Sequence, residues 1–282
     1  MAAQPGWLAQ VPERVGETRL PAGARVLFTG CGTSYHAALA CGPAAQALEL
    51  VLGNAPAADV LVAISHEGGT RLTLEAVEAF AGETWLVTGA ADSPLARATD
   101  RVVVVTPELE ESYCHTASYT CAVAAGRALQ GEDVSGLAAA VERELAAVPL
   151  GASEHERFLV AGAGADVPTA LEAVLKLREG AHVAAEAHHT EQLLHGHLAA
   201  IDPSVRCFVL EGEGRATERA AGALRALAEI GAEATLVPTT HPVVDIVRFQ
   251  RLTCDLAESR GIDPDLIRRD EEPWDRARQT YE

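Results

Sequence analysis

Residues 26–32 read VLFTGCG, and residues 158–164 read FLVAGAG. Each stretch is a short apolar run that ends in Gly-x-Gly and is followed by a segment of helical composition. Apolar runs of this length, bounded by glycine and followed by a helix, are typical of buried parallel strands. The sequence therefore predicts the same strand–turn–helix unit at two places, which indicates an internal repeat.

Further apolar runs extend the repeat, and each is followed by turn residues. Short apolar runs that alternate with Ala/Leu-rich helical stretches predict βα units on a parallel sheet. We therefore expect two α/β/α domains, at 22–135 and 153–282. The other predicted strands are VLVAIS (60–65) with RCFVLEG (206–212), TWLVTG (84–89) with EATLVPT (233–239), and RVVVVTP (101–107) in the first half alone.

The composition excludes several classes of protein. The chain has 282 residues and a formal net charge of −18, and a field of that sign repels nucleic acid and anionic membranes. No apolar run is long enough for a transmembrane helix, and the N-terminus does not resemble a signal peptide. The six cysteines are scattered without a CxxC pair. We therefore expect a cytoplasmic protein with free thiols.

Polar loops follow the predicted strands of the first half. Ligands of doubly wound sheets bind at the carboxyl ends of the strands. TGCGTSYH (29–36) precedes the predicted helix AALACGPAAQAL, and SHEGGT (65–70) and EESYCHTASYT (110–120) follow later strands. Their hydroxyls suit an anion at a helix N-terminus, and we expect Thr33 and Ser34 to cap the first helix. The candidate substrate-binding residues are Gly32, Thr33, Ser34, Ser65, His66, Glu67, Thr70 and Thr116.

The predicted helix at 170–180 carries a polar stripe. Glu172, Lys176 and Glu179 are spaced i, i+4 and i+7, so they share one face. Lys176 is the only lysine among 22 basic residues. The stripe fits the lining of a cavity, and it fits equally well an exposed Glu–Lys pair on a solvated face.

Three segments together resemble the double sugar-isomerase (SIS) domain family of phosphosugar isomerases, deglycases and deaminases. They are TGCGTSYHA, AISHEGGTRLTL and TALEAVLKLREGAHVAAEAHHTEQLLHGHLAAID. The resemblance covers about residues 22–282 and implies two three-layer α/β/α SIS domains with parallel sheets. It implies that Glu179 moves a proton between C1 and C2 of a sugar, that Lys176 and Glu172 surround its hydroxyls, and that His195 assists ring opening.

The resemblance also implies a homodimer with composite active sites, because the family's loop at His195 reaches the neighbouring subunit. The sequence departs from the family at Glu67, which replaces a phosphate-binding hydroxyl, and at Gln192, which replaces a glutamate. The tail lacks the lysine of the synthase members, and no glutaminase domain precedes the first strand. We therefore expect no glutaminase activity.

The expected function is enzymatic, on a sugar or amino sugar with or without a phosphate, and without a cofactor. The reaction is aldose–ketose isomerisation or deamination/deglycation. His188, Glu191 and His195 would fit a metal site if they shared a helix face. The family needs no metal and the H-E-x-x-H motif is absent, so we expect no metal. The alternative function is a non-catalytic carbohydrate-binding or sensing module.

Overall fold

The structure is a computed structural model that describes residues 1–151 and 154–281. The chain divides into two compact units. Unit 1 comprises Met1–Arg143 and the C-terminal segment from Arg268, and unit 2 comprises Glu144–Ile267. The domain boundaries expected from the sequence, 22–135 and 153–282, stay a prediction, and residues 153 and 282 lie outside the described residues.

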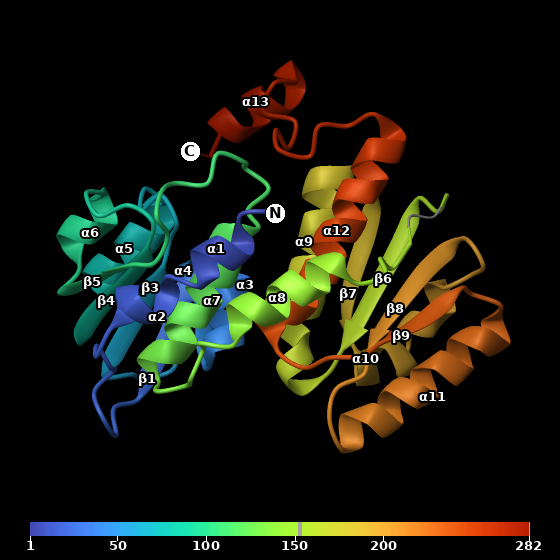
Figure 1. Cartoon of the computed structure of the whole chain (residues 1–282), viewed down its shortest axis with the longest axis horizontal. Coiled ribbons are helices and arrows are strands. Elements are labelled where there is room, and N and C mark those ends of the chain that lie inside the picture. Colours follow the sequence, from blue (N-terminus) through green and yellow to red (C-terminus); the bar gives the residue numbers. More distant parts are fainter. Residues whose placement is uncertain (152–153, 282) are drawn as a thin grey trace. The chain divides into compact units, whose positions relative to one another are not determined.

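Unit 1 is built on a parallel sheet with the strand order β2-β1-β3-β4-β5 (Figure 1). Four of these strands coincide with predicted apolar runs. Three of them are buried on both faces of the sheet, whereas the one at the far edge is buried only at Val103. The strands are β1 (Val26–Gly30), β2 (Ala44–Gln46), β3 (Val60–Ile64), β4 (Glu83–Thr88) and β5 (Arg101–Val104).

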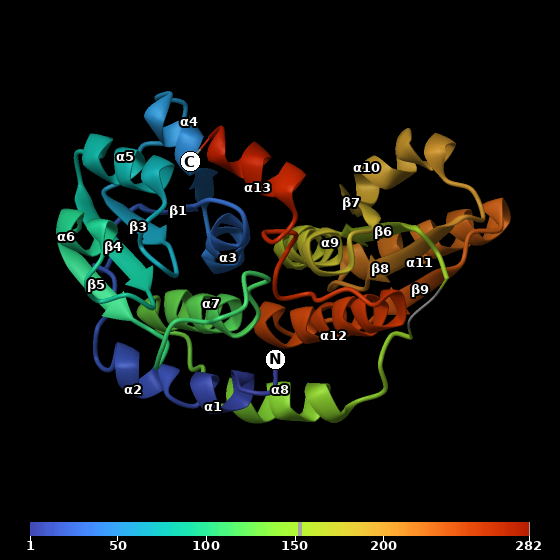
Figure 2. The same cartoon turned by 90° about the horizontal axis from the view of Figure 1, so that it is seen from above.

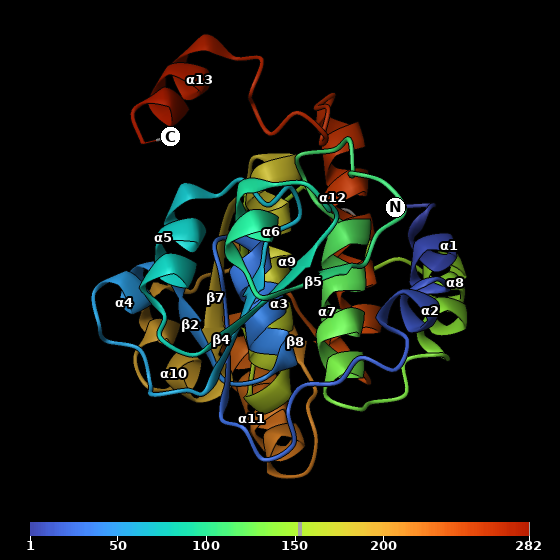
Figure 3. The same cartoon turned by 90° about the vertical axis from the view of Figure 1, so that its left-hand side faces the viewer.

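Helices cover both faces of this sheet, which gives the predicted three layers (Figure 2). One face packs a core of Leu27, Leu61, Val77, Leu86 and Leu95 under α4, α5 and α6, and Figure 3 looks onto the outer side of α5 and α6. The other face carries α3 and α7, with α1 and α2 packed on α7. The bounds are α1 (Gln4–Leu8), α2 (Val11–Val15), α3 (Thr33–Cys41), α4 (Ala47–Val51), α5 (Arg71–Ala79), α6 (Pro94–Ala98), α7 (Ala117–Leu129), α8 (Leu137–Ala146) and α13 (Glu272–Gln279).

Unit 2 contains a four-stranded parallel sheet with the order β7-β6-β8-β9. α10 and α11 pack on one face, and α9 and α12 pack on the other, where Phe208 meets Phe249 edge to face. The bounds are β6 (Arg157–Gly162), η1 (Gly164–Asp166), α9 (Val167–Ala181), β7 (Ala184–His189), α10 (Thr190–Leu194), η2 (His197–Ala200), β8 (Val205–Leu210), α11 (Arg215–Ile230), β9 (Ala234–Val237) and α12 (Pro242–Arg260).

The repeat inferred from the two Gly-x-Gly stretches is confirmed by the topology, because β2-β1-β3-β4 and β7-β6-β8-β9 follow the same order. A Cβ on Gly30 would lie 2.7 Å from the carbonyl carbon of Ser34, and one on Gly162 would lie 2.9 Å from the carbonyl oxygen of Asp166. The second glycine of each stretch has a positive φ, 56° at Gly32 and 58° at Gly164. Both turns therefore need glycine at both positions, since a side chain would clash or strain the backbone.

Some local predictions were wrong. The helix expected over AALACGPAAQAL ends at Cys41, because Gly42 and Pro43 interrupt it, and the short strand β2 and the helix α4 follow. No strand was predicted directly after α9, but β7 pairs along β6. Within the described residues, no helix is long and apolar enough to cross a membrane.

Candidate functional site

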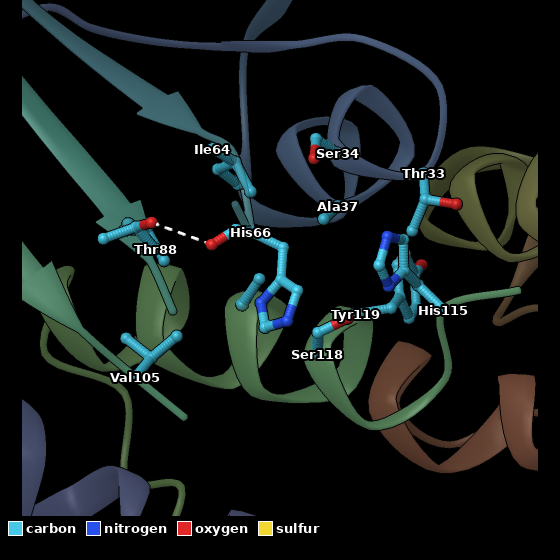
Figure 4. A pocket seen from close by; sticks show the side chains of 12 residues that line it. Thr33, Ser34, Ala37, Ile64, His66, Thr88, Val105, His115, Ser118 and Tyr119 are labelled. Carbon is cyan, nitrogen blue, oxygen red and sulfur yellow. Dashed lines mark hydrogen bonds between the residues drawn. The ribbon is translucent and has the colours of Figure 1, made fainter. Parts of the chain in front are cut away.

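Unit 1 has a pocket of about 320 Å³ at the carboxyl ends of its strands. It lies at the ends of β3 and β4 and is covered by the starts of α3 and α7. The strand order reverses next to it, between β1 and β3, and doubly wound sheets bind ligands near such a point. Its apolar wall includes Ile64, Val87 and Val105. Its polar lining comes from the start of α3, the loop after β3 and the start of α7 (Figure 4): Thr33, Ser34, His66, His115, Ser118 and Tyr119.

The pocket gathers three of the predicted substrate-binding residues, namely Thr33, Ser34 and His66. Thr33 does not cap α3 as expected, because Gly32 occupies the N-cap position and makes no side-chain cap. The other candidates lie in the same loops but outside the pocket lining. They are Gly32, Ser65, Glu67, Thr70 and Thr116.

The loop after β3 carries the largest departure from the family pattern. Ser65 is buried, whereas Glu67 and Thr70 are exposed. Thr70 is the N-cap residue of α5 and makes no side-chain cap. Arg71 donates to Glu75 at 2.9 Å, so its guanidinium is engaged one turn further along α5. The structure therefore places the charge of Glu67 in solvent beside a helix N-terminus.

His66 is held as a neutral imidazole. Its Nε2 accepts a hydrogen bond from the backbone N–H of Glu110 at 2.8 Å, which leaves its proton on Nδ1. Burial, and next the neighbouring His115, lower the pKa of His66 to about 4. The two rings meet edge to face with centroids 5.3 Å apart. At neutral pH, His66 therefore offers hydrogen bonding and no charge.

Glu110 anchors the start of α7. Its Oε1 accepts hydrogen bonds from the N–H groups of Thr116 and Ala117 and from the Thr116 hydroxyl, and its Oε2 accepts two from Ser118. Burial favours the neutral acid, but contact with the His115 ring and the hydrogen bonds of Ser118 and Thr116 outweigh it and hold the pKa of Glu110 well below its usual range. The N-terminus of α7 is therefore already occupied by an internal anion.

Unit 2 holds the polar stripe predicted on α9. Lys176 Nζ lies 2.6 Å from Glu179 Oε2 and 3.4 Å from Glu172 Oε1. The side chains of Lys176 and Glu172 are 1% and 0% exposed, and that of Glu179 is 24% exposed. The interpretation as an exposed pair on a solvated face is therefore wrong. Glu179 is the member of this buried cluster that reaches solvent.

His195 lies at the end of α10 and is 70% exposed. Its Nε2 lies 2.8 Å from Glu191 Oε1, and Glu191 also accepts two hydrogen bonds from Arg219. The Arg219 guanidinium lowers the pKa of Glu191. His188 lies in β7 and so does not share a helix face with Glu191 and His195, which was the condition for a metal site there. Within the described residues, no group of histidine, cysteine and acidic side chains forms a metal site.

A second pocket, of about 610 Å³, lies at the carboxyl ends of β6, β8 and β9 in unit 2. Its lining is acidic and includes Asp166, Glu213 and Asp245. Burial raises the pKa of Asp245 to about 6, although Thr240 donates to its carboxylate. The two units therefore share a topology but line their pockets with different chemistry.

Sequence reasoning missed Glu110, His115, Ser118 and Tyr119. A signal for them was present, because EESYCHTASYT was singled out as a polar loop, but only Thr116 was chosen from it. Thr116 instead binds Glu110. The pocket of unit 1 is lined by the residues on either side of Thr116 in that loop.

Comparison with known proteins agrees with this fold. Residues 152–263 match the family model of the SIS domain, so this part of the chain is an SIS domain. The chain is 30% identical to a glutamine–fructose-6-phosphate aminotransferase (isomerizing) of Aeropyrum pernix, over 88% of the chain and 51% of that protein. The chain thus spans about half the length of the curated relatives it matches.

Two solved structures share the fold over nearly the whole chain. Glucosamine-6-phosphate deaminase from Thermotoga maritima has a TM-score of 0.76 and 22% identity, with 94% of this chain and 95% of that chain covered. Tagatose-6-phosphate ketose/aldose isomerase from Escherichia coli has a TM-score of 0.77 and 16% identity, with 94% and 93% covered. The prediction of three-layer α/β/α units with parallel sheets is confirmed.

We expect Glu110→Gln to destabilise the protein by about 1–3 kcal/mol at pH 7, because it removes the ionised acceptor at the start of α7. A carboxyl with a lowered pKa stabilises the fold above its unfolded pKa of about 4.3, and that contribution is lost as the pH falls further. The difference from the wild type should therefore shrink at about pH 3. Urea unfolding at both pH values measures it, with the exposed neighbour Glu111→Gln as control. An equal difference at both pH values would contradict the assignment.

Proposed function

We propose that the chain is an enzyme of the phosphosugar isomerase kind, acting on a sugar or amino sugar that carries a phosphate. The reaction is aldose–ketose isomerisation or deamination/deglycation. The observation that carries the proposal is the buried cluster of Glu172, Lys176 and Glu179 on α9. The relatives' names, which refer to fructose 6-phosphate, glucosamine 6-phosphate and tagatose 6-phosphate, support this class of substrate.

The chemistry needs a group that takes a proton from one carbon and returns it to its neighbour. An aldose and a ketose interconvert through an enediol when a base removes the proton from C1 or C2 and delivers it to the other carbon. Glu179 suits this role because its carboxylate is partly exposed, and the Lys176 ammonium holds it at 2.6 Å. Glu172 and Lys176 position it, and His195 assists ring opening.

The unit 1 residues predicted to bind the substrate supply ligand contacts in this proposal, and unit 1 itself is a second SIS domain. The assignment of unit 1 as a second SIS domain is supported by the strand order that unit 1 shares with the region at 152–263 that matches the SIS family model. No step of the proposal uses a cofactor, a metal or a glutaminase activity. The cytoplasmic location stays a prediction.

One observation favours the alternative of a non-catalytic carbohydrate-binding protein. Lys176 is 1% exposed and both neighbouring carboxylates contact it, which is also what a purely structural buried ion pair requires. The two functions predict different effects of replacing Glu179. If the cluster is only structural, the wild type binds the ligand without turnover, and the replacement has no reaction to slow.

We expect Glu179→Gln to lower turnover of fructose 6-phosphate or glucosamine 6-phosphate by roughly 10²–10⁴ and to leave their binding nearly unchanged. The amide keeps the shape of the carboxylate but cannot accept a proton. Steady-state assays and calorimetry measure the two effects. Glu218→Gln, an exposed glutamate of α11, is the matched control and should be neutral. Near-normal turnover of the Glu179 variant would reject the role.

We expect Glu67→Ser to tighten binding of glucosamine 6-phosphate by about tenfold. Two unit charges about 4 Å apart in a partly polar surrounding repel by about 4 kcal/mol, and exposure of Glu67 reduces the effect to about 1.4 kcal/mol, which is a factor of ten. Calorimetry at low salt measures it. Glu78→Ser removes the same charge from an exposed position further along α5 and should change little. Equal effects of both variants would leave Glu67 without a specific role.

We further propose a homodimer in which the exposed His195 segment of one subunit serves the site of its partner. His195→Ala and Glu179→Gln chains are each expected to be inactive. When the two kinds of chain exchange between dimers, the mixture should recover up to about a quarter of the activity. About half of the dimers are then mixed, and one of the two sites in each mixed dimer is intact. Sedimentation confirms that mixed dimers form. Mixed dimers without activity would show that each site is built from one chain.

A further inference from the structure

We propose that His115 is a ligand-contacting residue of the unit 1 pocket, positioned by Glu110, and that its ring accepts a hydrogen bond from a hydroxyl of a sugar. The inference rests on the proposed function in one respect, namely that the ligand is a sugar. It assigns a role to a residue that neither the motif pattern nor the acid/base cluster of α9 contains.

The first support is the fixed position of Glu110. Five hydrogen bonds from the first turn of α7 engage both of its carboxylate oxygens, and its side chain is 9% exposed. A carboxylate held in this way cannot rotate toward solvent without releasing the end of the helix. The His115 ring therefore lies beside an immobile negative charge.

The second support is the orientation of the His115 ring. Its Nδ1 lies 3.6 Å from Glu110 Oε2 and is buried, and the side chain as a whole is 23% exposed. The adjacent anion favours a proton on Nδ1, because an N–H directed at a carboxylate is attracted and a lone pair is repelled. In the neutral ring, Nε2 then carries the lone pair.

The third support is the chemistry of the pocket wall. The residues that line it include no lysine or arginine, and His66 is neutral because burial lowers its pKa to about 4. Ile64, Val105 and Ala122 supply apolar surface that suits the C–H face of a sugar. Figure 4 shows the ring of His115 near Thr33 on the wall of the pocket, with Ser118 and Tyr119 beside it. Such a wall matches a chain of hydroxyls better than a phosphate dianion.

The test uses glucitol 6-phosphate, a polyol phosphate without a carbonyl group. The enzyme cannot isomerise or deaminate it, so its binding does not depend on the proposed reaction. We expect His115→Ala to weaken its affinity by a factor of about five to ten, the usual effect of one hydrogen bond. His115→Gln, whose amide oxygen restores an acceptor, should recover most of that loss. His36→Gln on α3, outside the pocket lining, is the control.

A second measurement needs no variant. Nitrogen chemical shifts of the His115 ring in the full chain are expected to show the Nδ1–H tautomer, and Nε2 is expected to shift when glucitol 6-phosphate binds. The inference is overturned if the free protein holds the proton on Nε2, if Gln and Ala variants bind equally weakly, or if the wild type does not bind the probe. Loss of turnover in Glu179→Gln alongside unchanged probe binding in His115→Ala would uphold the proposed reaction and reject this inference.

Discussion

The ammonium of Lys176 is removed from water, and α9 can be buried only because two carboxylates accompany it. Transfer of an isolated ammonium into a protein interior has an effective penalty of several kcal/mol. Glu172 and Glu179 offset this penalty with contacts at 3.4 and 2.6 Å. Two carboxylates around one ammonium leave a surplus negative charge, and that charge can be solvated only at Glu179, which is 24% exposed. The burial of the cluster therefore decides which carboxylate can reach a ligand.

A second constraint comes from the parallel strands, whose carboxyl ends and following helix N-termini meet at one edge of each sheet. In unit 1, β1 and β3 bring Ser34 and His66 to one pocket. In unit 2, the equivalent strands β6 and β8 bring Asp166 and Glu213 to another. The topology thus fixes where a pocket forms, and the residues at the loop ends determine what it can bind.

The sequence predicted the strands that read as continuous apolar runs, including the edge strands β5 and β9, and it missed the other edge strand of each sheet, β2 or β7. β2 has only three residues, and β7 reads AAEAHH with half of its positions polar or charged, so neither shows the apolar pattern of a buried strand. The spacing of Glu172 and Lys176 correctly predicted a shared helix face. It did not predict burial, because an i,i+4 pair has the same spacing on a solvated helix.

The site was predictable where its residues directly follow a strand, as Thr33, Ser34 and His66 do. It was not predictable where the loop before α7 folds back, because the contact of Glu110 with His66 joins residues 44 positions apart. No local spacing encodes such a contact. Glu110 was overlooked for a further reason, since one more glutamate in a chain with 40 acidic residues does not stand out.

The charge distribution around the unit 1 pocket depends on the carboxylate of Glu110. The residues that line the pocket include no lysine or arginine, so attraction for an anion has to come from the hydroxyls of the lining and from backbone N–H groups at helix starts. α7 cannot supply it, because Glu110 already accepts its first N–H groups. α3 and α5 begin without a side-chain cap. At the start of α3, Ser34 and Tyr35 donate to the backbone oxygens of Cys31 and Gly32, and the exposed Glu67 lies beside the start of α5. Within unit 1, the start of α7 is therefore the part of the pocket least suited to a further anion, because Glu110 already holds its N–H groups.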